Sequence, residues 1–405
     1  MSSKIYMGGP VLRQETEKQY ALLMNTSYYP HFGGVENSLR SMAEVLLKKG
    51  WDVFIVTSDR GLHDGSRLEP YSKLSGVCVY RYRHDHPFSY YYSCYKVIKK
   101  LVDSQRFAFV LSRSHITTIC AMLAGVTGAT YLLPATFKLQ NAKKFNSTWG
   151  LLKSLKYSGN VMLQKLAINW APRNYVFSEI MEAQVKSLAP KVGHIGICKP
   201  GVDPLRFFSV ANNDKFYNKK QIGINPDMHV ALCLGRFAKV KGFDIAIGMA
   251  RHLGPDWVLV LVGDGPEKGA LISQVENMGL QGKVRIFPAT DQPEGFYQIA
   301  DVFIMPSLYE PLGQVMLEAS FSGLPVVAFD PGSNQNIQTA TREVYRDFPD
   351  LVHFAHAFSE QSLAEGVGRA ASGFSEAALL QRQEFIERYS WENTVAHLLH
   401  APSNP

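Results

Sequence analysis

The chain has 405 residues, of which 46% are hydrophobic and 19% charged, a balance typical of folded globular proteins with two or three domains. It contains no run of about 18 apolar residues, so no transmembrane helix is predicted, and its first residues lack the apolar core of a signal peptide. The five scattered cysteines fit neither a disulfide framework nor zinc spacing, so we expect a reducing, cytoplasmic location.

The net charge of +7 is divided unevenly along the chain. Residues 1–200 carry a net charge of +14, whereas residues 201–405 carry −7. From Tyr92 to Arg173 there are 12 basic residues and one acid, Asp103. Such a block favours an anionic partner, either a membrane surface, a phosphate-bearing substrate or nucleic acid, and a solvated basic face is the alternative. No recognisable nucleic-acid motif accompanies it, so we expect no nucleic-acid partner.

The first elements predict the opening of a doubly wound parallel sheet. Residues 1–19 have no clean periodicity and form an irregular leader. An apolar strand at 20–25 leads into a loop with Gly33 and Gly34. A helix with a basic last turn then ends at a glycine, and a second strand covers 52–57. This order of strand, turn, helix and strand is typical of α/β sheets.

The next region repeats the pattern. Strands are predicted at 107–111 and 130–133, with a helix of small residues at 117–124 between them. Residues 149–170 form a long helix with a tryptophan at each end and several lysines. This helix either lies in a membrane interface or packs on the sheet as an ordinary amphipathic helix.

A second cycle begins after the Pro/Gly-rich segment 199–204, which is a hinge candidate. The predicted domains are 1–199, 200–385 and a C-terminal helix and tail at 386–405, with residues 385–400 helical. The strands predicted for the second cycle are 230–235, 257–263, 283–287, 302–305 and 325–329.

Two glycine-containing loops are candidate phosphate sites. Gly33 and Gly34 end a strand and open a helix, where free N–H groups favour an anion. Neither a dinucleotide G-x-G-x-x-G fingerprint nor a G-x-x-x-x-G-K-S/T phosphate loop is found on a suitable unit. Gly235 to Gly242 follows the first strand of the second cycle, and Arg236 and Lys241 bracket it as two cations suited to a diphosphate.

Two carboxylates stand eight positions apart around the start of a helix. Glu310 lies at the mouth of the predicted site, and Glu318 lies about two turns further along the same face. Carboxylates accept hydrogen bonds from sugar and ribose hydroxyls, although acids at a helix start are also favoured by the macrodipole alone. The N–H groups of Leu312, Gly313 and Gln314 can bind further oxygens.

Together these motifs resemble retaining glycosyltransferases of the GT-B fold, in particular glycosyltransferase family 4 (group 1). The resemblance covers nearly the whole chain from Tyr20 and is strongest between residues 234 and 332. Glu310 and Glu318 match the family's E-x7-E signature within an E-P-x-G-x-x-x-L-E-A run. The other matching segments are Gly33-Gly34-Val35-Glu36, Gly263-Asp264-Gly265-Pro266 and the run from Gly323 to Ala328.

The resemblance implies a role for each matched residue. Arg236 and Lys241 would hold the donor diphosphate and stabilise the leaving nucleotide, and Glu310 would bind the transferred sugar. Glu318 would bind the nucleotide ribose. The implied catalytic residues are Glu310, Arg236 and Lys241; the implied donor-binding residues are Gly34, Gly235, Arg236, Lys241, Gly263, Leu312, Gly313, Gln314 and Glu318.

The implied mechanism is front-face substitution without a protein nucleophile, a metal or a cofactor. The acceptor hydroxyl attacks the face that the nucleotide leaves, and the protein's contribution is mainly electrostatic. The donor is a UDP- or GDP-linked sugar. The chain has no D-x-D motif, and His84-Asp85-His86 is interpreted as a polar loop rather than a metal cluster.

The chain departs from the family pattern on the acceptor side. Lys138 stands where the family often has a histidine, and Pro331 to Gln335 replaces a Gly-Gly-x-x-Glu run. Gly33, His115 and Lys138 are therefore the candidate acceptor-side residues.

The sequence thus predicts two Rossmann-like domains facing each other across a cleft, with a C-terminal helix crossing back to the first domain. The expected activity is sugar transfer to a glycan or lipid-linked acceptor in envelope or lipid-linked glycan synthesis, with the protein peripheral on the inner face of a membrane. The alternatives are a nucleotide-sugar epimerase or phosphorylase on the same fold, and a non-enzymatic module that binds anionic surfaces. The oligomeric state is not predicted.

Overall fold

The computed structural model describes residues 18–31, 33–61, 66–85, 89–134, 136 and 151–400, with no side chains for 151–156. Almost all of the predicted leader at 1–19, together with His86 and Lys138, lies outside the described residues.

The first domain is built on an eight-stranded sheet with the order β3-β4-β2-β1-β5-β6-β7-β8. All neighbouring strands are parallel except β3 and β4, which form an antiparallel hairpin at one edge. The sequence analysis missed this hairpin. The strands are β1 (Tyr20–Met24), β2 (Asp52–Ser58), β3 (Tyr71–Leu74), β4 (Val77–Tyr82), β5 (Phe109–Ser112), β6 (Thr130–Leu132), β7 (Arg173–Val176) and β8 (Ile195–Ile197).

Helices cover the first sheet. Helix α1 shows why they do so, since its buried Leu39, Met42 and Leu46 recur at helical spacing and enter the core beneath the sheet. The helix stops where Gly50 takes a left-handed conformation with φ of 82°. The helices of this domain are α1 (Gly34–Lys48), α2 (Ser89–Ser104), α3 (His115–Leu123), α5 (Leu151–Trp170) and α6 (Glu179–Leu188).

The second domain contains a six-stranded parallel sheet with the order β11-β10-β9-β12-β14-β16. Its strands are β9 (His229–Leu234), β10 (Trp257–Val262), β11 (Val284–Phe287), β12 (Val302–Met305), β14 (Val326–Phe329) and β16 (Val352–Ala355), and a separate parallel pair is formed by β13 (Tyr309–Glu310) and β15 (Gln338–Thr339). Its helices are α7 (Asn212–Gln221), η2 (Lys239–Lys241), α8 (Phe243–Met249), η3 (Ala250–His252), α9 (Lys268–Asn277), α10 (Glu294–Ile299), α11 (Gln314–Phe321), α12 (Thr341–Val344), η4 (Pro349–Leu351), α13 (Glu360–Ala370) and α14 (Glu376–Arg388).

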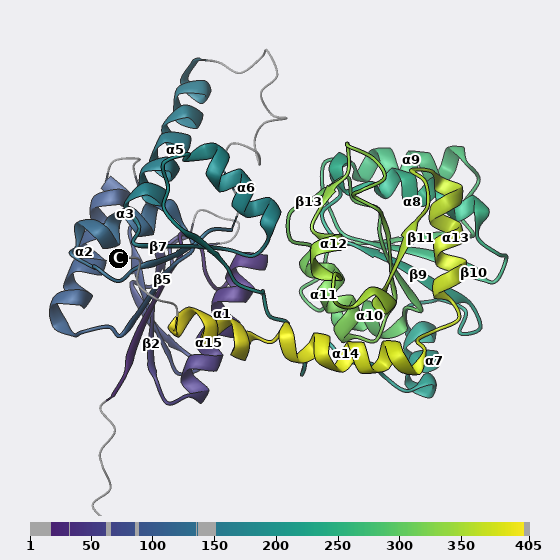
Figure 1. Cartoon of the computed structure of the whole chain (residues 1–405), viewed down its shortest axis with the longest axis horizontal. Helices are drawn as coiled ribbons and strands as arrows, with labels where there is room; N and C mark the ends of the chain where they lie inside the picture. The colour runs from purple at the N-terminus through teal and green to yellow at the C-terminus, as the bar shows by residue number, and fades with distance from the viewer. Residues whose placement is uncertain are drawn as a thin grey trace, which may run out of the picture.

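Both sheets reverse their direction of winding beside their first strand. In the first domain the chain adds β2 on one side of β1 and β5 on the other. In the second, β10 lies on one side of β9 and β12 on the other. The prediction of two Rossmann-like domains is confirmed (Figure 1). Ligands of such sheets bind outside the carboxyl ends of the strands at these switch points.

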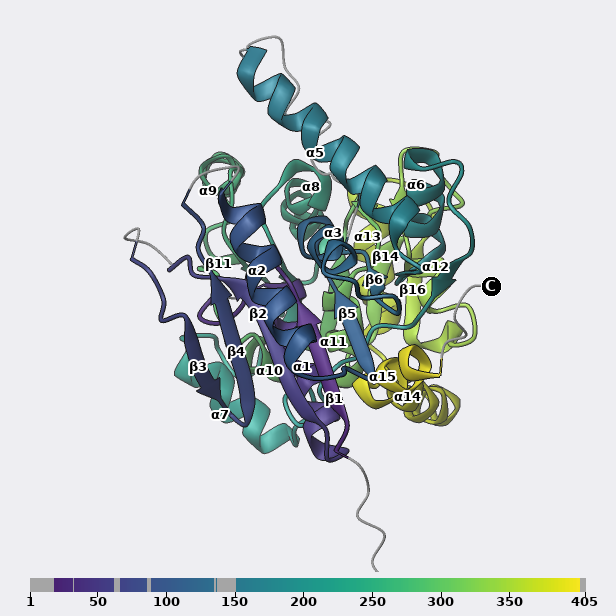
Figure 2. The same cartoon turned by 90° about the vertical axis from the view of Figure 1, so that its left-hand side faces the viewer.

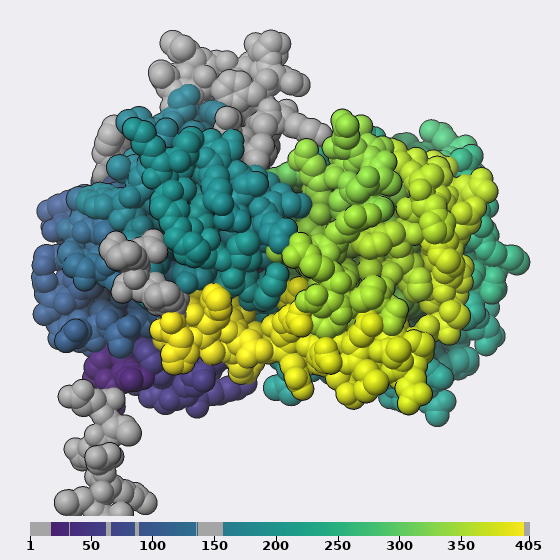
Figure 3. All heavy atoms as spheres, in the orientation of Figure 1, coloured from purple at the N-terminus to yellow at the C-terminus, as the bar shows by residue number. Residues whose placement is uncertain are grey.

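The C-terminal segment spans both domains. Phe385 of α14 is buried against Tyr345 and Phe348 of the second domain. Helix α15 (Trp391–Leu399) instead buries Trp391 and Val395 in the core of the first domain. The predicted crossing back to the first domain is therefore observed, and Figure 3 shows this segment in yellow across both domains.

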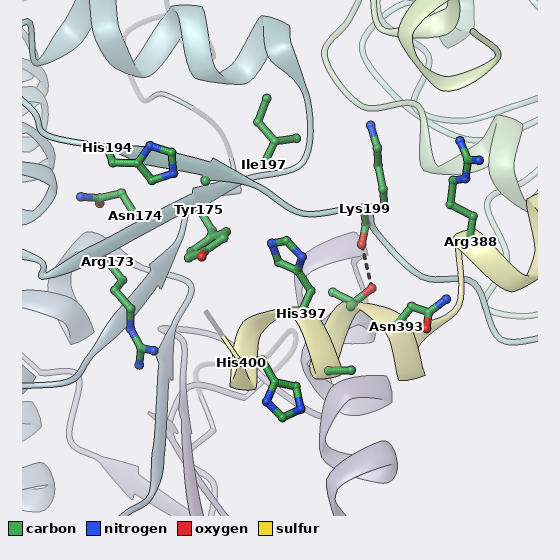
Figure 4. A pocket seen from close by; sticks show the side chains of 13 residues that line it. Arg173, Asn174, Tyr175, His194, Ile197, Lys199, Arg388, Asn393, His397 and His400 are labelled. Carbon is green, nitrogen blue, oxygen red and sulfur yellow. Dashed lines mark hydrogen bonds between the residues drawn. The ribbon is translucent and has the colours of Figure 1, made fainter. Parts of the chain in front are cut away.

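The prediction of one continuous helix over 385–400 is wrong. The chain breaks at Ser390, whose side chain accepts a hydrogen bond from Asn393 N and so caps a new helix. Beside the break, the Thr394 hydroxyl donates to the carbonyl oxygen of Lys199 over 2.7 Å (Figure 4). The pocket drawn there, about 850 Å³, lies between β7, β8 and α15 and contains none of the predicted site residues.

A single methyl group at Gly201 tests the docking of α15. A Cβ atom there would stand 2.4 Å from the backbone nitrogen of Trp391, so Gly201→Ala must displace the start of α15. We expect a loss of about 1–3 kcal/mol in the free energy of unfolding, with faster hydrogen exchange in α15. Gly368→Ala is the control, because a Cβ at this site in α13 meets no atom within 4 Å, and it should stabilise by about 0.5–1 kcal/mol. Equal stability of the two variants would contradict the prediction.

Candidate active site at the domain interface

Two glycine-containing loops of the second domain hold Arg236 in place. Gly235 N donates to Val262 O over 3.0 Å, and Phe237 N donates to Asp264 O over 2.8 Å. A Cβ atom on Gly263 would lie 2.0 Å from Gly235 O, so only glycine allows this approach. The G-D-G-P segment thus packs against the backbone of the Arg236 loop and fixes its position. Arg236 itself is exposed and makes no ion pair or hydrogen bond with any residue that the structure describes.

Lys241 and Glu310 form an ion pair at the switch point of the second sheet. Lys241 comes from the loop after β9 and Glu310 from the segment after β12, and these strands are neighbours. The side chain of Lys241 is 26% exposed and that of Glu310 12% exposed. Since water screens this pair only partly, the ion pair orients both groups more firmly than a surface pair would.

A left-handed glycine positions the lysine. Gly242 has φ of 68°, and a Cβ atom there would lie 2.1 Å from Pro306 O. The chain can therefore turn from η2 into α8 in close contact with the end of β12. This contact sets the distance between Lys241 and Glu310.

The segment between the two carboxylates begins helix α11. Gly313 is its N-cap residue, with φ of 75°, and a Cβ atom there would lie 3.2 Å from Cγ of Glu310. The side chains of its neighbours bind the first domain and the linker: Leu312 packs on the first domain's core, and Gln314 Nε2 donates to Gly201 O over 3.0 Å. The predicted ligand contacts of residues 312–314 can therefore involve only their backbone N–H groups.

Glu318 lies deeper than the mouth of the site. The Tyr297 hydroxyl donates to Glu318 Oε2 over 2.8 Å and also contacts Val315 O. Burial raises the pKa of the Glu318 carboxyl to about 7, although the Tyr297 hydrogen bond acts in the opposite direction. The sequence analysis did not predict Tyr297, since nothing in its local pattern distinguishes it from a core aromatic.

The two domains meet directly beside Glu310. Ser178 Oγ, at the start of α6, donates to Pro311 O over 2.5 Å. Gln184 Nε2 donates to the hydroxyl of Tyr309 over 2.8 Å. Next to these contacts lies an interdomain cavity of about 480 Å³. It is lined by Ile180, Ala183, Gln184 and Ser187 of α6 and by Pro331, Ile337, Gln338 and Thr339 of the second domain.

Charged groups reinforce this interface. Glu343 accepts a hydrogen bond from Glu179 N over 2.7 Å and pairs with Lys199 Nζ over 3.3 Å. Arg346 Nη2 contacts both carboxylate oxygens of Glu179, at 2.9 and 3.1 Å. Polar contacts thus join the two domains beside Glu310, together with the packing of Leu312 against the core of the first domain.

The structure places the acceptor-side candidates unequally. Gly33 and Gly34, the second of which is a predicted donor-binding residue, both lie at the N-terminus of α1. No atom lies within 4 Å of a Cβ at Gly34, whereas a Cβ at Gly33 would stand 2.5 Å from Glu36 Oε2. His115 is mostly buried and faces Asn160 of α5, and this burial lowers its pKa. Lys138 is outside the described residues. Of these residues, only Gly34 is therefore seen at the carboxyl edge of the first sheet with open space around it.

Two further features of the described residues bear on the class of protein. No helix among them is both long enough and apolar enough to cross a membrane. No group of three or more His, Cys, Asp and Glu side chains among them has an arrangement that could hold a metal ion.

Comparison with known proteins agrees with this geometry. Residues 214–367, which contain the Arg236 loop, Glu310 and Glu318, match the family described as Glycosyl transferases group 1. An uncharacterized glycosyltransferase of Methanocaldococcus jannaschii is 26% identical over 92% of this chain and 95% of its own length. The lipopolysaccharide core biosynthesis glycosyltransferase LpsE of Rhizobium meliloti is 35% identical, over 34% of this chain and 41% of its own length.

The whole chain also has a known architecture. The crystal structure of Anabaena HepE in complex with UDP and glucose covers 94% of this chain and 99% of its own, with a TM-score of 0.71 and 16% identity. The two domains therefore have the GT-B fold. Together, the family match and the fold support a glycosyltransferase with a group 1 domain.

Replacing Glu318 by glutamine tests its burial. The pKa of Glu318 is about 7 in the folded chain and 4.5 for a carboxyl in the unfolded chain. The folded state therefore binds the proton more tightly than the unfolded state does. The stability that this gives is complete below pH 4 and is lost as the pH rises through 7. Glu318→Gln should therefore gain stability relative to the unmodified protein between pH 5 and pH 8, by about 1–3 kcal/mol.

Thermal denaturation at the two pH values measures this difference. Glu276→Gln, which changes an exposed carboxylate on α9, is the matched control. A Glu318→Gln effect that is the same at pH 5 and pH 8 would show that the carboxyl is not desolvated.

Proposed function

We propose that this protein is a retaining glycosyltransferase of family 4 that transfers a hexose from a UDP- or GDP-linked sugar to a hydroxyl acceptor. The observation that carries the proposal is the Lys241–Glu310 ion pair at the switch point of the second sheet, in which Lys241 shares the loop after β9 with Arg236, a cation with no partner among the described residues. Two cations and a carboxylate at this edge match the charges of a sugar diphosphate, whose phosphates are anionic and whose sugar offers hydroxyl donors.

The two cations have different tasks in this proposal. Arg236 is exposed, and its planar fork of donors would bind the diphosphate. Lys241 is already oriented by Glu310 and needs little reorganisation to stabilise the charge that develops on the leaving diphosphate. Glu310 then exchanges part of its contact with Lys241 for hydroxyls of the transferred sugar.

A deeper pair would bind the nucleoside. Glu318, oriented by Tyr297, would accept hydrogen bonds from the ribose hydroxyls. The backbone N–H groups at the start of α11 would bind further donor oxygens. In the front-face mechanism that we propose, the acceptor hydroxyl is the nucleophile and bonds to the sugar carbon as that carbon's bond to the diphosphate breaks. A phosphate oxygen of the leaving group takes the hydroxyl proton, and Arg236 and Lys241 supply the positive charge in place of a metal.

The comparisons support a nucleotide-sugar donor and a glycan acceptor. HepE was crystallised with UDP and glucose, and LpsE acts in the synthesis of the lipopolysaccharide core. For this chain we accordingly propose a role in envelope or lipid-linked glycan synthesis.

Methionine in place of Lys241 tests the donor site. Lys241→Met should lower turnover roughly a hundred- to a thousand-fold, the usual cost of removing one group that stabilises transition-state charge. It should also weaken the thermal stabilisation by UDP or GDP. The matched control is Lys239→Met, because Lys239 lies two residues away but is 67% exposed and pairs with Asp244. Equal turnover in the two variants would refute the assignment of the site.

Helix α5 supports a membrane-associated acceptor. Its inward face buries Gln164, Ala167 and Ile168, whereas an outward stripe exposes Met162 (74%), Leu166 (46%) and Trp170 (41%). Figure 2 shows the first turns of this helix projecting beyond the body of the first domain. An apolar stripe on a helix within a basic segment is typical of helices that lie in a membrane interface. We therefore propose that the protein binds the inner face of a membrane peripherally.

Flotation with vesicles tests this proposal. The protein should float with vesicles that contain phosphatidylglycerol, less so with neutral ones, and less at high salt. Changing Met162, Leu166 and Trp170 together to serine should reduce the bound fraction at least about tenfold. The control replaces Leu379 and Leu380, which are as exposed on α14 of the second domain, and should leave binding intact. Binding that ignores lipid charge, or that survives the α5 change, would contradict the proposal.

A further inference from the structure

Arg113 is a buried cation with no ionic partner among the residues that the structure describes. It directly follows β5 and is 3% exposed. Its Nε and Nη1 atoms are shut off from solvent and have no hydrogen-bond partner. Within the described ranges no carboxylate lies within 4.0 Å of its guanidinium, which instead lies over the ring of Phe177, 4.9 Å from the ring centroid.

The burial of this charge lowers the stability of the folded protein. Burial lowers the pKa of Arg113 to about 10, so the guanidinium still carries its charge at neutral pH. A buried charge without a counter-ion destabilises the fold strongly, and an arginine is seldom kept in this state for stability alone. An anion that binds there would remove the cost.

Arg113 lies at the switch point of the first sheet. Its backbone N–H donates to Met24 O over 2.8 Å, which places it beside the carboxyl end of β1. Strands β1 and β5 are the neighbours between which the winding direction changes, so the crevice above them is a ligand position. The position corresponds in the first domain to that of Lys241 and Glu310 in the second.

The N-terminus of α1 opens at the same place. This 15-residue helix has no side-chain cap at Gly33, and the space around Gly34 is open. Glu36 of its first turn contributes to the electrostatic environment of Arg113, although the two form no ion pair. A helix N-terminus and a guanidinium at the same edge of a sheet are suited to a phosphate group.

We propose that Arg113 and the first turn of α1 bind a phosphate group of the sugar acceptor. This inference rests on the proposed glycosyl transfer. Arg113 belongs to the first domain, whereas the donor diphosphate is assigned to Arg236 and Lys241 of the second.

The contacts around Arg113 place the proposed acceptor phosphate on the side of the first domain that faces the donor site. Phe177, on which the guanidinium stacks, precedes Ser178, and Ser178 contacts Pro311 next to Glu310. A phosphorylated acceptor bound at Arg113 therefore enters the cleft from the wall opposite the donor.

Thermal denaturation with inorganic phosphate tests the site without any turnover. The unmodified protein should be stabilised by millimolar phosphate beyond the effect of chloride at equal ionic strength. Arg113→Met should be at least as stable as the unmodified protein without phosphate, because the buried charge is gone, and should lose the phosphate response. A residue with a purely structural role would instead lower the melting temperature when it is replaced and leave the phosphate response unchanged, and that result would overturn the proposal.

Two further arms separate the acceptor phosphate from the donor. Arg113→Met should keep the stabilisation by UDP or GDP, whereas Lys241→Met should lose it and keep the response to inorganic phosphate. Loss of both responses in Arg113→Met would assign Arg113 to the donor and overturn the proposal. Absence of any nucleotide response in the unmodified protein would count against the glycosyl transfer itself, with the phosphate arm unaffected.

Arg113→Lys serves where the methionine variant does not fold. It keeps the charge but not the planar fork, and should weaken phosphate binding about tenfold in a titration. Unchanged binding in this variant would contradict recognition by the guanidinium.

Discussion

The Lys241–Glu310 ion pair is the interaction around which the second domain's site is arranged. Its members come from the loops after two adjacent strands, β9 and β12, so the pair lies across the crevice at which the direction of winding changes. Gly242 and Gly313 take left-handed conformations on either side of it, and a Cβ atom would lie 2.1 Å from Pro306 O at Gly242 and 2.9 Å from Cε of Met316 at Gly313. The site therefore depends on backbone contacts that only glycine permits, and the charges follow from them.

Much of this arrangement could be predicted from the sequence. Apolar runs predict four of the eight strands of the first sheet and five of the six strands of the second. Arg236 directly follows one predicted strand, and Lys241 and Glu310 lie a few residues after predicted strands. In a parallel sheet the carboxyl ends of strands meet at one edge, so short-range patterns suffice to bring these residues together.

The remainder depends on contacts between distant parts of the chain. The pairing of Glu318 with Tyr297 and that of Gln184 with Tyr309 join residues 21 and 125 positions apart, for which no local pattern exists. The break at Ser390 depends on which domain each half of the segment can pack against. Arg113 did have a local signal, since it follows a strand as Arg236 does, but its burial without a partner is visible only in three dimensions.

The domains are joined by two chain segments that lie side by side. Val202 N, in the linker between the sheets, donates to Tyr389 O over 2.8 Å, next to the break between α14 and α15. Because the two segments cross between the domains at one place, any change in the angle between the domains bends both of them there. Moving the domains apart to admit or release a ligand therefore bends both segments near Val202 and Tyr389, and it breaks the polar contacts of Ser178 and Gln184 with the second domain.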